Sequence, residues 1–249
     1  MALYEKYWDL LNSLNIVAVL SGSPRAGVDF FQSLFDGHKQ VITFDGWLLF
    51  HEFYARSYSI FGTSRLIAGE NGVNNGQIVE NINVRNFFYE FAWSNLYKFD
   101  SRYDELEAKN CLGKDGNDFN LVDIDIFVEH AVKLMDDKEM TSRNTFLATY
   151  GAFALARGES LFEKKIILHQ VHFAEHVVEV LHDFPQLKII ACVRDPRIIA
   201  TMFFRFNAEI GLSKIGILSA HSIFSRMVNG FDILNSMDSK DIRINVLEK

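Results

Sequence analysis

Residues 15–35 read NIVAVLSGSPRAGVDFFQSLF. The first part, Asn15–Leu20, is a short apolar run of the kind that forms a strand buried on both faces of a parallel sheet. The run ends in Ser-Gly-Ser-Pro, and residues 27–35 then carry apolar side chains at helical spacing. We therefore expect a strand, a glycine-containing loop and a helix in direct succession.

The rest of the chain alternates in the same way. Further strands are expected at 40–44, 164–170, 188–193 and 243–247, and helices at 1–14, 46–60, 86–97, 124–135, 141–157, 174–182, 196–206 and 213–225. Strands that alternate with helices predict an α/β fold, here three layers around a central parallel sheet of about five strands. We interpret 1–249 as a single domain with a mostly helical insertion around 46–160.

Composition narrows the possible partners and the cellular setting. The 23 phenylalanines predict an aromatic core, and the net charge of −7 argues against nucleic acid as a partner. No apolar stretch approaches the roughly 18 residues that a membrane span needs. The two cysteines, Cys111 and Cys192, are far apart in sequence, so we expect no disulfide framework, a cytoplasmic location and a buried Cys192.

The loop at Ser21–Asp29 has the character of an anion site. Successive peptide N–H groups between a strand and a helix attract a phosphate. Gly22 and Gly27 have the spacing of the phosphate-loop pattern G-x-x-x-x-G-K-[ST]. Val28 replaces the lysine of that pattern, and Asp29 replaces the hydroxyl that holds Mg²⁺. The loop is thus expected to bind a phosphate without the usual means of holding a metal.

Two arginines supply the missing positive charge. Arg25 lies inside the loop, and Arg194 follows the strand expected at 188–193. After Arg194, Asp195 is expected to cap a helix and Pro196 to lie in its first turn. Ligands of open parallel sheets bind outside the carboxyl ends of the strands. We expect both arginines to converge there on a nucleotide that carries phosphates at two positions.

These residues resemble a known enzyme family. The sequence SGSPRAG at 21–27, followed by FFQSL at 30–34, resembles the 5′-phosphosulfate loop of sulfotransferases, and VRDPR at 193–197 resembles their 3′-phosphate motif. These enzymes use 3′-phosphoadenosine 5′-phosphosulfate (PAPS), need no metal for transfer and fold like nucleotide kinases. The resemblance implies a P-loop nucleotide-kinase-like fold, PAPS as co-substrate and no metal.

The resemblance also implies a role for individual residues. Arg25 would bind the 5′-phosphate and the sulfuryl group, Arg194 would bind the 3′-phosphate, and His172 would deprotonate the acceptor. The predicted catalytic residues are therefore Arg25 and His172. The predicted cofactor-binding residues are Gly22, Ser23, Pro24, Arg25, Ala26, Gly27, Val28, Asp29, Arg194, Thr201 and Met202.

Several positions depart from the family pattern. Val28 and Asp29 stand where threonine is usual, and a carboxylate at Asp29 would repel a bound phosphate. Met202 replaces an expected serine, with Thr201 one place early, and Gln170 stands where cytosolic members have lysine. Further helices follow the late strand in the family, so we interpret the chain as a truncated piece or a short member.

The resulting interpretation is a PAPS-dependent sulfotransferase-like enzyme that acts on a hydroxyl or amine acceptor, with a carbohydrate as one example. Two alternatives stay open: a Mg²⁺-dependent nucleotide or small-molecule kinase, and a catalytically degenerate nucleotide-binding module, which Asp29 and Met202 favour. His169 is a second candidate base or a structural histidine. The pattern H-x-x-E-H at 172–176 resembles a zinc-peptidase motif but has no third ligand motif. Neither the acceptor nor the oligomeric state follows from the sequence.

Overall fold

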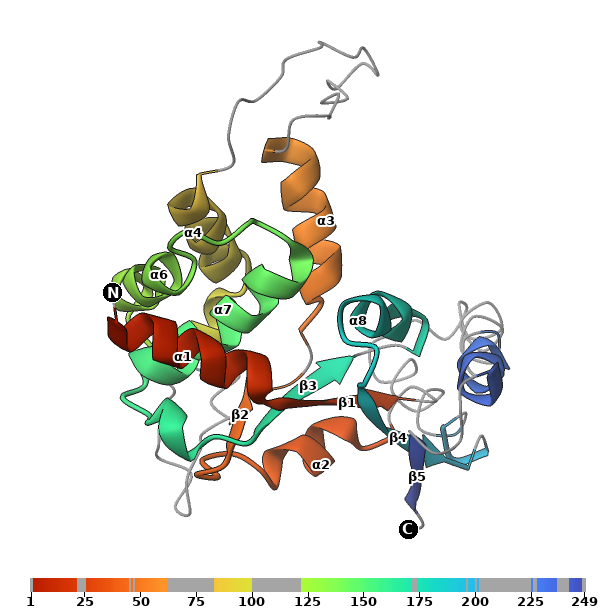
Figure 1. The fold of residues 1–249 in the computed structure, drawn as a ribbon. Coiled ribbons are helices and arrows are strands. Elements are labelled where there is room, and N and C mark those ends of the chain that lie inside the picture. The colour runs from red at the N-terminus through yellow and green to blue at the C-terminus, as the bar shows by residue number, and fades with distance from the viewer. Residues whose placement is uncertain are drawn as a thin grey trace, which may run out of the picture. The chain divides into compact units, whose positions relative to one another are not determined.

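The chain divides into two compact units in a computed structural model (Figure 1). The model describes residues 2–21, 26–44, 46, 48–61, 83–99, 122–171, 174–195, 197–199, 201, 225, 228–236 and 242–247. The first unit comprises Met1–Leu14, Gly37–Ile42 and Leu49–Lys165, and the second comprises Asn15–Asp36, Thr43–Leu48 and Ile166–Lys249. The interpretation of 1–249 as one domain stays a prediction.

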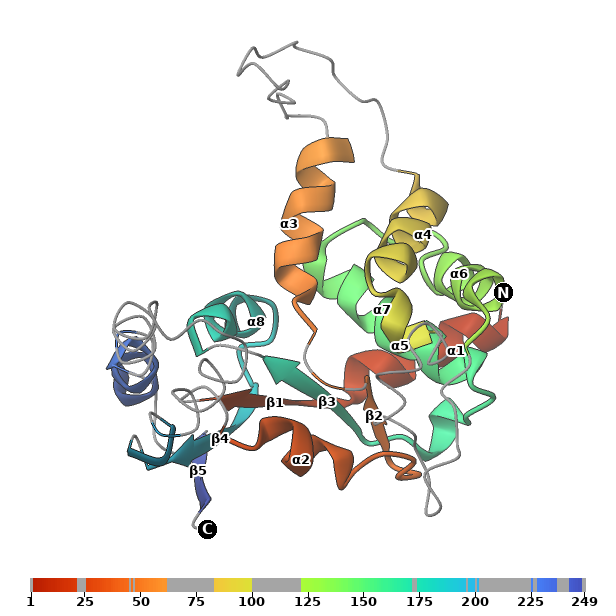
Figure 2. The ribbon, with the colours of Figure 1, turned by 180° about the vertical axis from the view of Figure 1, so that it is seen from behind.

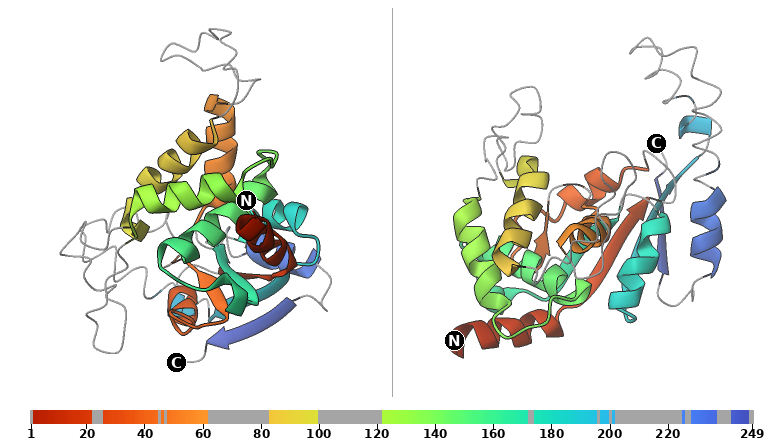
Figure 3. Two further views of the ribbon diagram at one scale, coloured as in Figure 1. Left: turned by 60° about the vertical axis from the view of Figure 1, so that its left-hand side comes forward. Right: turned by 90° about the horizontal axis from the view of Figure 1, so that it is seen from above.

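The sheet has five strands in the order β2-β3-β1-β4-β5. They are β1 (Asn15–Ser21), β2 (Val41–Thr43), β3 (Ile166–Val171), β4 (Lys188–Arg194) and β5 (Ile242–Leu247). The pairs β1–β3, β1–β4 and β4–β5 are all parallel, and β4 and β5 run side by side in Figure 3. The predicted α/β fold with a parallel sheet of about five strands is therefore confirmed. The order differs from the 3-2-1-4-5-6 and 2-1-3-4-5 orders of two common doubly wound folds.

Strand β1 is the central strand because its apolar run is covered on both faces. Ala18, Val19 and Leu20 are each 0% exposed. Leu20 pairs with Val171 of β3 on one side and with Ala191 of β4 on the other. The carboxyl ends of these three strands therefore lie at one edge of the sheet.

Helices cover both faces of the sheet in the second unit. Helix α2 (Val28–Ser33) follows β1 and packs on β1 and β3, whereas α8 (Val177–Asp183) connects β3 to β4. The chain thus leaves β1 towards one side of the sheet and leaves β3 towards the other, and right-handed crossovers then place the two helices on opposite faces. Figures 1 and 2 show this arrangement. Adjacent strands whose connections leave in opposite directions mark the topological switch point, where α/β sheets bind ligands.

The first unit is helical and has an aromatic core. Its helices are α1 (Ala2–Ser13), α3 (Phe50–Phe61), α4 (Val84–Ser94), α5 (Leu96–Phe99), α6 (Ile124–Leu134) and α7 (Ser142–Ala156), and a 3₁₀ turn, η2 (Leu161–Glu163), follows them. Rings from α3 to α7 meet mostly edge to face, the geometry that aromatic pairs prefer. The predicted aromatic core is confirmed. In the described ranges, no helix combines the length and apolar character needed to cross a membrane.

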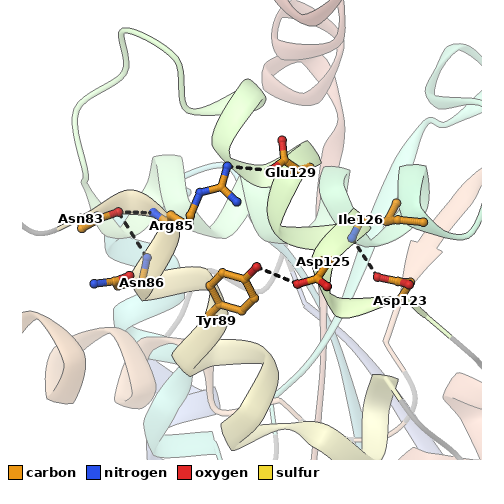
Figure 4. Close-up of polar contacts among 8 residues, drawn as sticks. All are labelled: Asn83, Arg85, Asn86, Tyr89, Asp123, Asp125, Ile126 and Glu129. Carbon is orange, nitrogen blue, oxygen red and sulfur yellow. Dashed lines mark hydrogen bonds and ion pairs between the residues drawn. The ribbon is translucent and has the colours of Figure 1, made fainter.

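Side-chain caps fix where two of these helices begin (Figure 4). Asn83 Oδ1 accepts a 2.9 Å hydrogen bond from the Arg85 N–H, and Asp123 Oδ1 accepts one of 3.0 Å from the Ile126 N–H. Such caps satisfy N–H groups that have no partner inside the helix. Arg85 also forms a 2.6 Å ion pair with Glu129, which links α4 to α6.

Three predicted helices have different bounds. The helix predicted from residue 46 begins at Phe50, because Gly46 has a left-handed φ of 63°. The helix predicted at 86–97 is interrupted at Asn95, whose φ of −123° and ψ of 33° are not helical. The helix predicted at 174–182 begins as a 3₁₀ turn, η3 (Ala174–His176), before α8. The helix predicted at 213–225 lies outside the described residues except for Ser225.

Candidate functional site at the carboxyl edge of the sheet

The register of β1 and β4 places Arg194 just beyond the end of β1. Ser21, the last residue of β1, pairs with Cys192, so Arg194 lies two positions further along β4. Neighbouring strands are about 4.8 Å apart. Arg194 is half-buried, and its Nε atom is buried. Residues 22–25, which follow β1, lie outside the described part of the chain.

At the end of the loop, Gly27 is partly exposed, whereas its two neighbours are buried. Gly27 precedes α2 with a φ of 81° and a ψ of 24°, a left-handed conformation that glycine adopts without strain. It has no side chain with which to cap the first N–H groups of α2. Ala26 and Val28 are only 1% and 6% exposed. Of these three residues, Gly27 is therefore the one that a ligand can reach.

A long-range hydrogen bond ties the first turn of α2 to the end of β3. Gln170 Nε2 donates to Asp29 Oδ1 at 2.7 Å. Gln170 is 3% exposed, whereas Asp29 is an exposed residue. The Gln170 carbonyl also accepts a 3.3 Å hydrogen bond from the Leu48 N–H. Gln170 therefore holds the carboxylate of Asp29 at the edge of the sheet between β1 and β3.

A second glutamine holds the same helix closer to its C-terminus. Gln32 is 2% exposed, and its Nε2 donates to Thr43 Oγ1 at 2.6 Å and to the carbonyl of Phe44. These bonds fix α2 against the end of β2 and the residue that follows it. Both ends of α2 are thus positioned by buried amides, which makes the orientation of its first turn well defined.

The residues after Arg194 form a capped helix start. Asp195 Oδ1 accepts a 2.8 Å hydrogen bond from the Arg197 N–H, which confirms the predicted cap. The Arg197 guanidinium also binds the same carboxylate, and this bond is the main reason that the pKa of Asp195 is lowered to about 2. Thr201 Oγ1 donates to the Arg197 carbonyl at 2.8 Å. Arg197 is therefore engaged by its neighbours within this turn.

The predicted site residues are only partly described. The described ones are Ala26, Gly27, Val28, Asp29, Arg194 and Thr201. Arg194 ends β4, and Asp29 in the first turn of α2 is bonded to Gln170 near the end of β3. Gly22, Ser23, Pro24, Arg25, His172 and Met202 lie outside the described residues. His169, the second candidate base, is 2% exposed and pairs with Ala18 in the middle of the sheet. Its position suits a structural histidine.

Other groups near this edge offer little chemistry. Cys192 is 1% exposed, as predicted, and burial raises the pKa of its thiol to about 11. Within the described ranges, His, Cys, Asp and Glu side chains form no group of three that could hold a metal ion. From the sequence, Gln170 is predicted only as a departure from a family pattern, and its bond to Asp29 is not predicted. The sequence feature that could have indicated a role for Gln170 is its position at the end of a predicted strand.

Comparisons with known proteins give one structural likeness. No family model matches the chain, and no curated protein matches it. The solved "Sulfotransferase Domain from the Curacin Biosynthetic Pathway" is similar, with a TM-score of 0.47 and 13% sequence identity. The similarity covers 94% of this chain and 67% of that domain. The residues at the edge of the sheet therefore carry the functional conclusion.

Proposed function

We propose that the chain is a sulfotransferase-like enzyme that transfers a sulfuryl group from PAPS to a hydroxyl or amine acceptor. The observation that carries this proposal is the parallel pairing of Ser21 with Cys192, which sets Arg194 two positions beyond the residue opposite the end of β1. This position adjoins the topological switch point of the sheet. The resemblance of residues 21–27 and 193–197 to the two PAPS-binding motifs is the reason that we propose PAPS as the ligand.

In this proposal, Arg194 and the loop itself hold the two ends of the nucleotide. Arg194 binds the 3′-phosphate, since a guanidinium makes forked, charge-assisted hydrogen bonds to phosphate. The peptide N–H groups from Ala26 to Val28 bind the 5′-phosphate together with Arg25. The partial exposure of Gly27, whose peptide lies between the buried Ala26 and Val28, supports this role.

The proposed chemistry is an in-line displacement at sulfur. The bond between sulfur and the 5′-phosphate oxygen breaks as a new bond forms to the acceptor oxygen or nitrogen, and the acceptor proton passes to His172. Imidazole suits this role because it ordinarily titrates near neutral pH. Arg25 and the peptide N–H groups stabilise the charge that develops on the leaving phosphate. A carbohydrate is one acceptor that this proposal includes.

Calorimetric titration with adenosine 3′,5′-bisphosphate tests the proposal. We expect Arg25→Ala and Arg194→Ala each to weaken binding at least 10-fold, from roughly 1.5–3 kcal/mol per charged contact. Arg85→Ala is the matched control, because it also removes one positive charge but lies in the helical unit, paired with Glu129. Unchanged affinity in both site variants would contradict the proposal.

The same protein distinguishes the two alternatives. A kinase would prefer ATP and would require Mg²⁺ for phosphoryl transfer, so titration with ATP and Mg²⁺ is the comparison. A degenerate binding module would bind adenosine 3′,5′-bisphosphate but would not transfer sulfuryl from PAPS to any acceptor. Transfer that proceeds in the presence of EDTA would support the metal-free reaction.

A further inference from the structure

The loop after β1 has flanks of opposite character. Strand β4 contributes the cationic Arg194 on one side. Strand β3 contributes the neutral Gln170 on the other side, hydrogen-bonded to the anionic Asp29. The flank at β4 therefore suits an anion, whereas the flank at β3 suits a hydrogen-bond donor or a cation.

The hydrogen-bond donor to the Asp29 carboxylate is the amide of Gln170. Among the described residues, no lysine or arginine forms an ion pair with this carboxylate. Asp29 is exposed, two positions after Gly27. A carboxylate at this place repels phosphate, so its favourable ligand is a positively charged group.

The Gln170 side chain is oriented so that the NH₂ group of its amide donates to Asp29. Its Nε2 must face Asp29, because the flipped amide would bring two oxygens together. In the described part of the chain, Gln170 Oε1 is buried without a hydrogen-bond partner, as is Gln32 Oε1. The bond from Nε2 to Asp29 therefore sets the orientation of the Gln170 amide.

We propose that Asp29, positioned by Gln170, binds a protonated amine of the acceptor. This inference rests on the proposed function, since His172 would follow β3 on this same flank. An ammonium group offers three hydrogen-bond donors to a carboxylate. A metal ion fits less well, because the described residues provide no cluster of three metal-ligating side chains. The net charge of −7 also favours a cationic acceptor.

The probes are glucosamine and N-acetylglucosamine, which differ in whether the amine is charged. Each is titrated calorimetrically into protein saturated with adenosine 3′,5′-bisphosphate. We expect glucosamine to bind at least 10-fold more tightly than N-acetylglucosamine, and Asp29→Asn to remove this preference. Asp232→Asn, an exposed residue on the helix at 228–236, is the matched control and should change nothing.

Gln170→Lys separates positioning from simple stability. The lysine would pair with Asp29 and neutralise it, so we expect amine binding to fall at least 10-fold while Tm stays the same or rises. A purely structural role for Gln170 would lower Tm without changing the preference between the two sugars. Gln170→Leu leaves Asp29 charged but removes its hydrogen-bond donor, so this variant should bind glucosamine with an intermediate affinity.

Three results would overturn the inference: equal affinity for the two sugars, no saturable binding of either, or full glucosamine binding by Asp29→Asn. Binding of Mg²⁺ alone that Asp29→Asn abolishes would replace the amine by a metal and would also overturn it. Titration of the nucleotide without sugar reports on the proposed function separately. Failure of the nucleotide to bind would therefore contradict the proposed function, whereas nucleotide binding without an amine preference would contradict only this inference.

Discussion

The side chain of Leu11 on α1 lies directly against Gly151 on α7. A Cβ atom built at Gly151 would lie 2.5 Å from Leu11 Cδ1 and 3.1 Å from Leu134 Cδ1. Leu11 is 1% exposed, and residues 145–154 of α7 are all buried. The absence of a side chain at Gly151 therefore lets α1 pack closely on α7.

Gly151→Ala should destabilise the helical unit. The added methyl group overlaps Leu11, and overpacking of this kind typically costs about 1–3 kcal/mol. Urea denaturation of the variant measures the loss of unfolding free energy. In a Leu11→Ala background the same substitution should cost markedly less, because the clashing atoms are gone. An equal cost in both backgrounds would contradict the packing explanation.

The ion pair of Asp195 with Arg197 should make the helical turn that follows β4 sensitive to strong acid. The folded pKa of Asp195 is lowered from 3.8 to about 2, chiefly by the Arg197 side chain. A lowered carboxyl pKa means that the stabilisation is fully present above pH 4 and is lost as pH falls through about 2. NMR titration of the Asp195 carboxyl measures this pKa, and in Arg197→Ala it should return towards its ordinary value.

His130 should make the helical unit less stable as the solution becomes mildly acidic. Its Nδ1 is 2.7 Å from the Tyr4 hydroxyl, and burial, helped by Lys133, lowers its pKa. The unfolded chain then binds a proton more readily than the folded one, so stability falls as pH drops below the ordinary value of 6.5.

His130→Gln tests this dependence by removing the titrating ring. The difference in urea midpoint between pH 7.5 and pH 5.5 should shrink in this variant. His182→Gln is the matched control, since the His182 side chain is 88% exposed, and it should leave the difference unchanged. An unaltered pH dependence in His130→Gln would rule out His130 as its source.

The Cys192 thiol should react slowly in the folded protein. With a pKa of about 11, roughly one thiol in a thousand is ionised at pH 8, and the thiolate is the reactive form. In a Cys111→Ser background, we expect labelling by a disulfide reagent at pH 8 to be at least 100-fold slower than in 6 M urea. Rapid labelling under native conditions would contradict the burial of Cys192.

The sequence predicts most of the sheet because its strands carry local signals. Asn15–Leu20 is a continuous apolar run, and the structure extends it by one residue to Ser21. The predicted helix at 124–135 likewise matches α6, whose start is fixed by Asp123 as its cap. Local propensity fails at Gly46 and Asn95, where single backbone conformations end a pattern that otherwise looks helical.

The candidate site is only partly predictable from the sequence. The loop glycines and Arg194 follow from motifs, because each lies next to a recognisable strand. The bond between Asp29 and Gln170 joins residues 141 positions apart, so no local pattern contains it. Taken separately, Asp29 and Gln170 are each a departure from a family motif. They come within hydrogen-bond distance because β1 and β3 are adjacent strands.

The pairing of Asn15 with Ile166 has a consequence for how the protein is made. The ribosome must add another 151 residues after Asn15 before the partner strand exists. At about 5–20 residues per second, the apolar strand at 15–20 waits roughly 8–30 s with both edges exposed. During this interval the strand at 15–20 is prone to aggregate with other chains. A chaperone that binds this segment should therefore raise the yield of folded protein.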